Sequence, residues 1–378
     1  MTKFGDFKII IFFKGGKKMS KFSLLFILFL LQTTLFAKCC DHKVPILEEN
    51  AKATVDQGFI LKTNYLYWNA YEDGLEYAQS IHLNLPIVTN IDATVKMFEP
   101  NSIWKGGFET GIGYIFPQRS QWDLMLNWTY FHSKATGSKS LDPATLATDM
   151  LRPIWLPFLL GSLSFNTDMN WTLYYNLLDL ILGKEFSLGK WLAFHPQAGI
   201  RGGWIHQMYK AFYEGFSFDG VSTVQLPETS FIAKWSFDGL GIRFGTDVEW
   251  RLHPNFSMIG NGFASILYGN MRLHEIFSGA FTPGPGILIT ESVHMNNKHH
   301  RIRTALETEL GFRYQTFFSN ETKRFMLGAY YGFSYWFNQN ALVNQFINLD
   351  AQGATTTVLP AKGDLQLQGL KIGLELDF

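Results

Sequence analysis

The chain has 378 residues, of which 47% are hydrophobic, 16% aromatic and only 17% charged, and its 32 basic residues balance its 32 acidic ones. The lack of a basic excess excludes the electrostatic footprint of a nucleic-acid-binding protein, so no nucleic-acid partner is expected. Frequent aromatic residues and 34 glycines, in short alternating stretches, favour an all-β protein with aromatic girdles instead.

The amino end has the pattern of a secretory signal peptide. Lysines precede the apolar run 22–31, and Ala37 is the expected last residue before cleavage. The run is too short for a membrane helix, which needs about 20 apolar residues, although an uncleaved anchor is the alternative. Met19 is an alternative start. We therefore predict a signal peptide over 1–37 and a periplasmic segment over 38–57, and cleavage would leave 26 basic and 31 acidic residues.

Cys39 and Cys40 are the only cysteines, and they are adjacent. Neighbouring cysteines rarely pair with each other, because the geometry of a disulfide is strained between them. In an exported protein either of them could form an intermolecular disulfide, and two ordinary thiols are an equally weighted alternative.

From residue 58 onward, apolar and polar side chains alternate with the period of two that a β-strand requires. In the terminal stretch 370–378, every even position is apolar and every odd position is Lys, Gly, Glu or Asp. Ten segments are predicted as strands: 59–68, 104–116, 122–130, 169–177, 192–204, 240–252, 256–268, 302–314, 325–337 and 370–378, of which 59–68 and 256–268 have less regular faces.

The connections between these segments also alternate in length. Short turns are expected near 117–121, 183–189, 253–255 and 318–323, and long links near 133–168, 207–230, 271–298 and 339–363. Outer-membrane barrels have this arrangement, which puts both ends of the barrel on the periplasmic side. The links could hide further strands, for example around 75–83 or 209–218. We predict a transmembrane antiparallel β-barrel over 58–378 with about 12 strands, within 10 to 16.

Alternation alone does not separate a membrane barrel from a soluble β-sandwich, whose apolar faces meet inside. The signal peptide, the asymmetric connections and the aromatic end of the last strand, Phe378, favour the barrel. Its apolar rows would face outer-membrane lipid and its polar rows the lumen. Such a barrel must close, because an open edge leaves backbone groups unpaired in lipid.

Three segments carry a family resemblance: Tyr65–Trp68, Gly107–Tyr114 and the stretch from Trp122 to His132. They resemble the pore-forming major-outer-membrane-protein-like family of Legionella and of chlamydia-related bacteria, over about 58–378. The resemblance implies a porin in the bacterial outer membrane, and the terminal strand is similar to those whose last Phe, here Phe378, is recognised by the barrel-assembly machinery. The chain departs from the cysteine-rich chlamydial members, which argues against extensive disulfide cross-linking.

We therefore predict an outer-membrane porin for passive diffusion of ions and small solutes. The expected pore-lining residues are Glu109, Asp123, Arg201, Arg243, Asp247, Glu249, Arg251, Arg301, Arg303, Glu307, Glu309 and Arg313. Both charge signs occur, so strong ion selectivity does not follow. A barrel that anchors structural or adhesive loops is one alternative. A channel for apolar solutes is another, suggested by the apolar segment 151–160, which would either enter the lumen or pack on the rim. The sequence leaves a homo-oligomer open.

No enzyme, metal site or cofactor is expected. His294, His299 and His300 lie in or beside a long link without a compact set of further ligands. The Gly-x-Gly pairs at 111–113 and 239–241 lack the rest of a dinucleotide-binding fingerprint. No nucleophile motif links a serine to a histidine, so no catalytic residue is assigned.

Overall fold

The computed structural model describes residues 57–84, 92–117, 122–145, 148–155, 162–218, 223–284, 287–318, 323–350 and 353–378. The chain divides into two compact units, 1–50 and 51–378, and every described residue belongs to the second. The predicted signal peptide and both cysteines therefore lie outside the described residues. Within the described part, no helix is long and apolar enough to cross a membrane.

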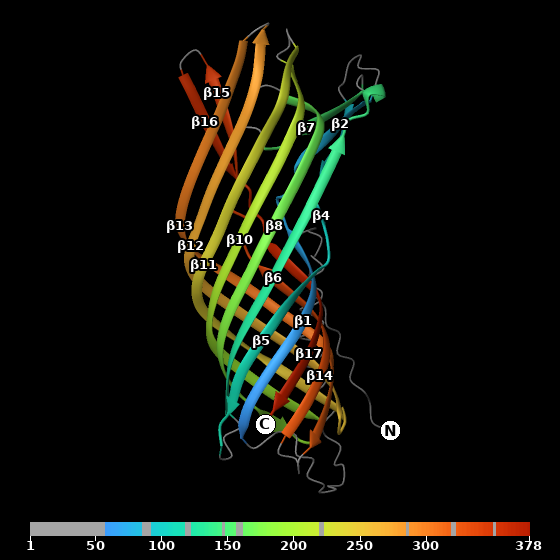
Figure 1. Ribbon diagram of the computed structural model, residues 1–378, viewed down its shortest axis with the longest axis vertical. Helices are drawn as coiled ribbons and strands as arrows, with labels where there is room; N and C mark the ends of the chain where they lie inside the picture. Colours follow the sequence, from blue (N-terminus) through green and yellow to red (C-terminus); the bar gives the residue numbers. More distant parts are fainter. Residues whose placement is uncertain are drawn as a thin grey trace, which may run out of the picture. The chain divides into compact units, whose positions relative to one another are not determined.

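Ten antiparallel strands of the described residues close into one barrel (Figure 1). In ring order they are β1 (Gly58–Glu72), β5 (Lys105–Ile115), β6 (Trp122–Ser140), β8 (Ser162–Lys184), β10 (Leu192–Phe218), β11 (Thr223–His253), β12 (Phe256–Gly284), β13 (Ile287–Phe318), β14 (Lys323–Trp336) and β17 (Leu365–Asp377), which pairs with β1. Each overlaps one of the ten segments predicted as strands from the sequence. The number of barrel strands thus lies at the lower end of the predicted range of 10 to 16.

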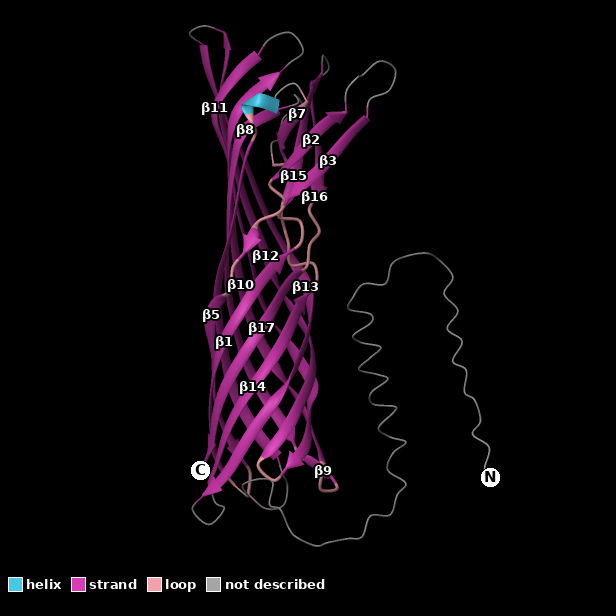
Figure 2. Cartoon of the chain, turned by 90° about the vertical axis from the view of Figure 1, so that its right-hand side faces the viewer, coloured by secondary structure: helices cyan, strands magenta, loops and turns pink. Residues whose placement is uncertain are grey.

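Smaller elements fill the connections. A three-stranded sheet consists of β2 (Ala78–Asn84), β3 (Asp92–Phe98) and β7 (Asp149–Pro153). A hairpin pairs β15 (Val343–Asp350) with β16 (Gly353–Pro360). The remaining elements are the short strands β4 (Asn101–Ser102) and β9 (Phe186–Leu188) and the 3-10 turn η1 (Pro143–Thr145). Figure 2 shows β9 and Phe378 at one end of the barrel, and the two small sheets at the other. We call these the turn end and the loop end. The predicted asymmetry of the connections is confirmed in part: long connections join β1 to β5, β6 to β8 and β14 to β17, whereas short ones join β10 to β11 and β12 to β13.

The six strands β6, β8 and β10–β13 continue beyond the closed barrel towards the loop end, as can be followed in Figure 1. β14 pairs with β13 only over Ala305–Phe318, so the earlier part of β13 lies beyond the ring. We call these extensions the projecting sheet: residues 131–140, 162–176, 205–218, 223–237, 270–284 and 287–304. The links expected over 207–230 and 271–298 are therefore mostly strand. β11 alone has 31 residues, about three times the length that a tilted strand needs to cross a bilayer.

The outer surface of the closed barrel is an apolar belt. Its exposed side chains include Leu61, Ile112, Leu126, Leu180, Ile200, Ile242, Ile266, Leu310, Leu327 and Ile372. Charged and polar residues alternate with them and point inward, as expected for every segment but one. The row Met169–Leu177 of β8 was expected to face lipid, but its odd-numbered residues are buried on the inside.

The reason for this reversal is a change of surroundings along each strand. Around the closed barrel the outside is apolar, whereas the projecting sheet keeps its apolar side chains inside. Trp171, Tyr209 and Trp235 of the inner face belong to one buried cluster with Tyr77 and Leu342 from the connections. The small sheets thus cover the inner face of the projecting sheet, as the strands of a water-soluble domain would cover a core.

The barrel closes at a tight seam between β1 and β17. Phe59 and Phe378 exchange two backbone hydrogen bonds, of 2.7 and 3.0 Å, next to the ladder from Ile60–Asp377 onward. Gly58 has a φ of +151°, and a Cβ at this position would lie 2.4 Å from the carbonyl oxygen of Phe378. A glycine is therefore required where the first strand meets the last.

Candidate functional site

A chamber of about 770 Å³ occupies the interior of the closed barrel. All ten barrel strands contribute inward side chains to its wall. The chamber extends from Trp68 and Tyr175, towards the loop end, to Ile115 and Arg324 near the turn end. Because a strand alternates its side chains strictly, the same sequence pattern that makes the apolar belt supplies this polar wall.

Nine of the twelve residues expected to line a pore lie on the chamber wall: Glu109, Asp123, Arg201, Arg243, Asp247, Glu249, Glu307, Glu309 and Arg313. The other three do not. Arg251 lies near the turn end and pairs with Glu185 at 3.2 Å. Arg301 and Arg303 have the inward register, but they belong to the projecting sheet, beyond the point where β14 ends. Their expected place on the pore wall is therefore corrected.

Sequence reasoning missed several wall residues. Lys371 and Glu375 stand on the polar face of 370–378, where the same alternation could have found them. Asp179 was missed for a different reason, since the apolar row just before it on β8 was assigned to the outside. Odd-numbered residues point inward along β8 from residue 167 onward, and after Leu177 this inward row changes from apolar to charged at Asp179.

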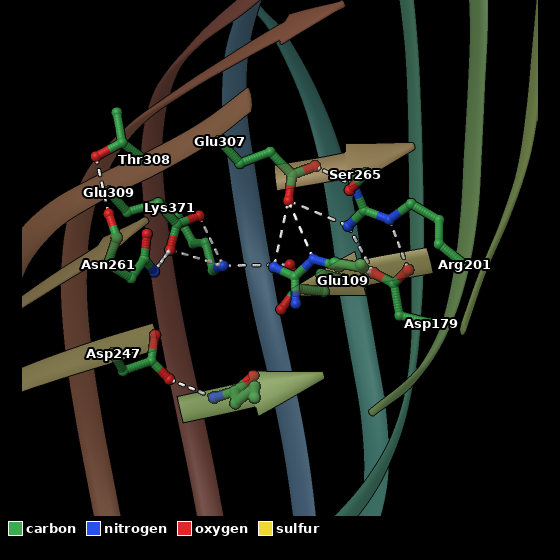
Figure 3. A network of polar contacts seen from close by, with 12 residues as sticks. Glu109, Asp179, Arg201, Asp247, Asn261, Ser265, Glu307, Thr308, Glu309 and Lys371 are labelled. Atoms are coloured by element: carbon green, nitrogen blue, oxygen red, sulfur yellow. Dashed lines mark hydrogen bonds and ion pairs between the residues drawn. The ribbon is translucent and has the colours of Figure 1, made fainter. Parts of the chain in front are cut away.

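The most buried charges of the wall form a cluster around Arg201, which is 2% exposed. Its guanidinium donates to both oxygens of Asp179 at 2.6 and 2.7 Å, and to Glu307 at 2.5 and 3.1 Å. Arg243 also donates to Glu307 at 3.2 Å and lies 3.7 Å above the ring of Phe263. Two guanidinium groups thus neutralise two carboxylates (Figure 3).

A second cluster lies beside the first and is centred on Lys371 of β17 (Figure 3). The Lys371 ammonium contacts Glu309 at 2.9 Å and Glu109 at 3.2 Å. Lys62 approaches Glu109 to 3.3 Å, and the Asn64 amide donates to the same carboxylate at 2.7 Å. Again two cations and two anions are held together, which reduces the cost of removing them from bulk water.

Polar contacts continue towards the turn end. His195 contacts Asp123 at 2.5 Å, and Gln197 donates to Asp247 at 2.6 Å. Arg313 pairs with Glu249 at 2.5 Å. In total, six Lys or Arg residues and nine Asp or Glu residues line the chamber, so its wall carries an acidic excess in either protonation state of His195.

An aromatic layer of Trp68, Tyr175 and Trp336 closes the chamber towards the loop end. Tyr175 and Trp336 come from β8 and β14, which stand opposite each other in the ring of ten. The Trp336 indole donates to the Tyr175 hydroxyl at 3.1 Å, and the rings meet edge to face at 6.0 Å between centroids. Beyond this layer the interior is filled by the buried cluster of the projecting sheet.

The apolar segment 151–160 contributes to that filling. Its described part, up to Trp155, lies inside the projecting sheet, where Trp155 stacks on Phe231 at 5.3 Å and donates to the Glu76 carbonyl at 2.7 Å. This described part is thus neither a constriction of the chamber nor a cover on the rim. The cavity beside Trp155 measures about 20 Å³, enough for roughly one water molecule and no solute.

Among the described side chains, no three His, Cys, Asp or Glu residues come together as a metal site. His299 and His300 lie on β13 in the projecting sheet rather than in a loop. The wall of the chamber offers ion pairs and hydrogen-bonding groups.

Comparisons with solved structures give distant likenesses. The outer membrane protease OmpT of Escherichia coli is 9% identical, with 87% of this chain and 99% of that chain covered and a TM-score of 0.30. A FadL homologue of Pseudomonas aeruginosa is 8% identical, with 85% and 90% covered and a TM-score of 0.24. The TodX monoaromatic hydrocarbon channel is 7% identical, with 87% and 92% covered and a TM-score of 0.22. Scores this low carry no argument about function.

No curated protein matches the chain at a significant level. The family described as Legionella pneumophila major outer membrane protein precursor does match, over residues 53–378. That range contains the whole barrel, including the seam and the chamber wall. The chain therefore belongs to the Legionella major outer membrane protein family and is a β-barrel of the bacterial outer membrane.

Proposed function

We propose that this protein is a porin, a passive channel for ions and small polar solutes whose conduction path is the chamber. The observation that carries the proposal is a polar interior of about 770 Å³ within the membrane belt. Burying so many ionised groups is costly, and a barrel that served only as an anchor would be more stable with a packed apolar interior. Interaction with water and solutes in the chamber would explain why these ionised groups are present.

The acidic excess of the wall predicts a modest preference for cations. Wall charges set the local potential that passing ions experience, and counter-ions concentrate beside the sign in excess. Because most carboxylates are paired with a nearby cation, the preference should be weak and should fade at high salt, where charges are screened within a few ångströms.

Passage through the barrel requires the aromatic layer to move. An anchor for surface loops remains the second candidate, because Tyr175 and Trp336 meet across the lumen and the projecting sheet is filled. The apolar-solute channel finds less support, since the cavity beside Trp155 is too small for a solute.

Planar-bilayer recordings of the refolded barrel separate these candidates. Met125 lies on the chamber wall and carries no charge, so Met125→Glu and Met125→Lys change the lumen without breaking an ion pair. In a channel, the two variants should shift the reversal potential under a KCl gradient in opposite directions. Arg301→Glu, beyond the aromatic layer, is the control and should shift it less. A silent parent protein would favour the anchor, and identical potentials would remove Met125 from the conduction path.

A further inference from the structure

Basic side chains gather on the outer face of the projecting sheet, directly beyond the apolar belt. The last outward apolar residues of the belt form one cross-strand row, Leu240, Tyr268 and Ile302 on β11, β12 and β13. Four residues further along β12 and β13, Arg272 and Lys298 stand opposite each other in the register. The outward surface thus changes from apolar to cationic over a short stretch of strand.

Arg272 and Lys298 line an open groove of about 670 Å³. Its wall includes Tyr174, His206, Lys234, Arg272, His274 and Lys298. The groove runs over β8 and β10–β13, and the exposed Lys134 stands beside it on β6, opposite Thr172 in the register. It is separate from the chamber, because no residue lines both of them.

The groove has an excess of positive charge. Asp238, in the row between the groove and the belt, accepts from Arg272 and, at 2.8 Å, from His206. Lys234 and Lys298 are exposed and have no acidic partner among the described residues. The two lysines therefore carry charge that an anionic ligand could neutralise.

The position of the groove suits the headgroups of a lipid. Four residues of strand span about 13 Å, and less along the membrane normal because barrel strands are tilted. Headgroup regions begin at the edge of the hydrocarbon layer and are several ångströms thick. Arg272 and Lys298 also have long apolar stems that can follow the surface of the sheet towards them. Since long loops face outward in such barrels, the relevant lipids are those of the outer leaflet.

We propose that this groove binds the phosphate groups of an anionic lipid in the outer leaflet. Arg272 would offer its planar donor fork to one phosphate, while Lys234 and Lys298 act as point charges. Tyr174 and Tyr268 stand at the level where aromatic rings favour the membrane interface. The proposal rests on the outer-membrane location of the barrel and not on the channel function, so either can fail alone.

The test compares binding of lipid A to the refolded barrel in phosphatidylcholine vesicles. The variant carries Lys234→Gln with Lys298→Gln, which spares the Arg272–Asp238 pair. The control carries Lys323→Gln with Lys362→Gln and removes the same charge from two exposed lysines outside the groove. The attraction of two lysines to an anionic surface together changes the affinity by about 30-fold. The variant should therefore bind lipid A about 30-fold more weakly than the parent, and the control should bind it as tightly as the parent.

A second arm separates a lipid from free phosphate. The groove should retain lipid A in the presence of inorganic phosphate, because the acyl chains hold the headgroup at the belt. Equal losses in variant and control would overturn the assignment, as would full displacement by inorganic phosphate. Heat-modifiable migration of each variant shows that it is folded, so weak binding cannot arise from a failed barrel.

Discussion

Trp336→Ala should both destabilise the barrel and widen its closed end. The Trp336 side chain is fully buried, contacts the opposite wall through Tyr175 and packs near Leu177 and Leu267 around Gly203. Truncating a buried aromatic residue to alanine costs about 3–5 kcal/mol. The neutral hydrogen bond to Tyr175 accounts for about 1 kcal/mol of that, and lost packing for the rest.

Two measurements on the same preparation check this prediction. Urea unfolding in lipid vesicles gives the loss of stability, and single-channel recording gives the conductance. Trp336→Phe is the matched variant: it keeps a ring in the layer but loses the donor, so it should cost about 1–2 kcal/mol and leave conductance near that of the parent. If Trp336→Ala lost under 1 kcal/mol and conducted like Trp336→Phe, the aromatic layer would not be what closes the lumen.

Three further predictions concern the wall, the seam and the amino end. Leu306→Arg puts a charge in the apolar belt and should cost about 2–4 kcal/mol in vesicle unfolding, whereas Asn127→Arg on the chamber wall should cost clearly less; equal losses would mean that the faces are misassigned. Gly58→Ala and deletion of Phe378 should both reduce the heat-modifiable fraction of outer-membrane protein. The alanine Cβ would lie 2.4 Å from the Phe378 carbonyl oxygen, and the deletion removes the two backbone hydrogen bonds between Phe59 and Phe378. Mass spectrometry of the exported protein should find an amino end near Lys38, and an intact signal segment would contradict the predicted cleavage.

The ten barrel strands could be predicted because, throughout the membrane belt, the apolar residues keep to the outward positions of each strand. The prediction failed where the apolar residues move to the inward positions. On β11, Leu240 and Ile242 point outward to the belt, while Trp235 and Phe237 point inward to the buried cluster. The strand itself does not change, but its apolar residues move from even to odd positions. Sequence reasoning that follows one phase therefore ends the strand at the edge of the membrane, and it mistook strand for loop in 207–230 and 271–298.

The chamber wall shows a related limit. Alternation placed Arg201, Arg243 and Glu307 on one polar face, but it could not show that they meet, because they come from β10, β11 and β13. It also could not show how far the lumen extends. Arg303 shares its face with Glu307, yet lies outside the chamber, since the length of β14 decides where the ring ends.

The pattern of contacts inside the lumen bears on whether the barrel can open. The ion pairs between strands of the described wall join strands at most three places apart in the ring, as in Lys371 with Glu309 and Arg201 with Glu307. They hold charges against the wall and leave the chamber free. The contact between opposite strands, Tyr175 with Trp336, is a neutral hydrogen bond. Breaking a buried ion pair costs about 3–5 kcal/mol, whereas a neutral hydrogen bond contributes about 0.5–1.5 kcal/mol. Opening the lumen at this level therefore requires the displacement of rings and no separation of charge, which is why a structure closed by an aromatic layer is compatible with a channel.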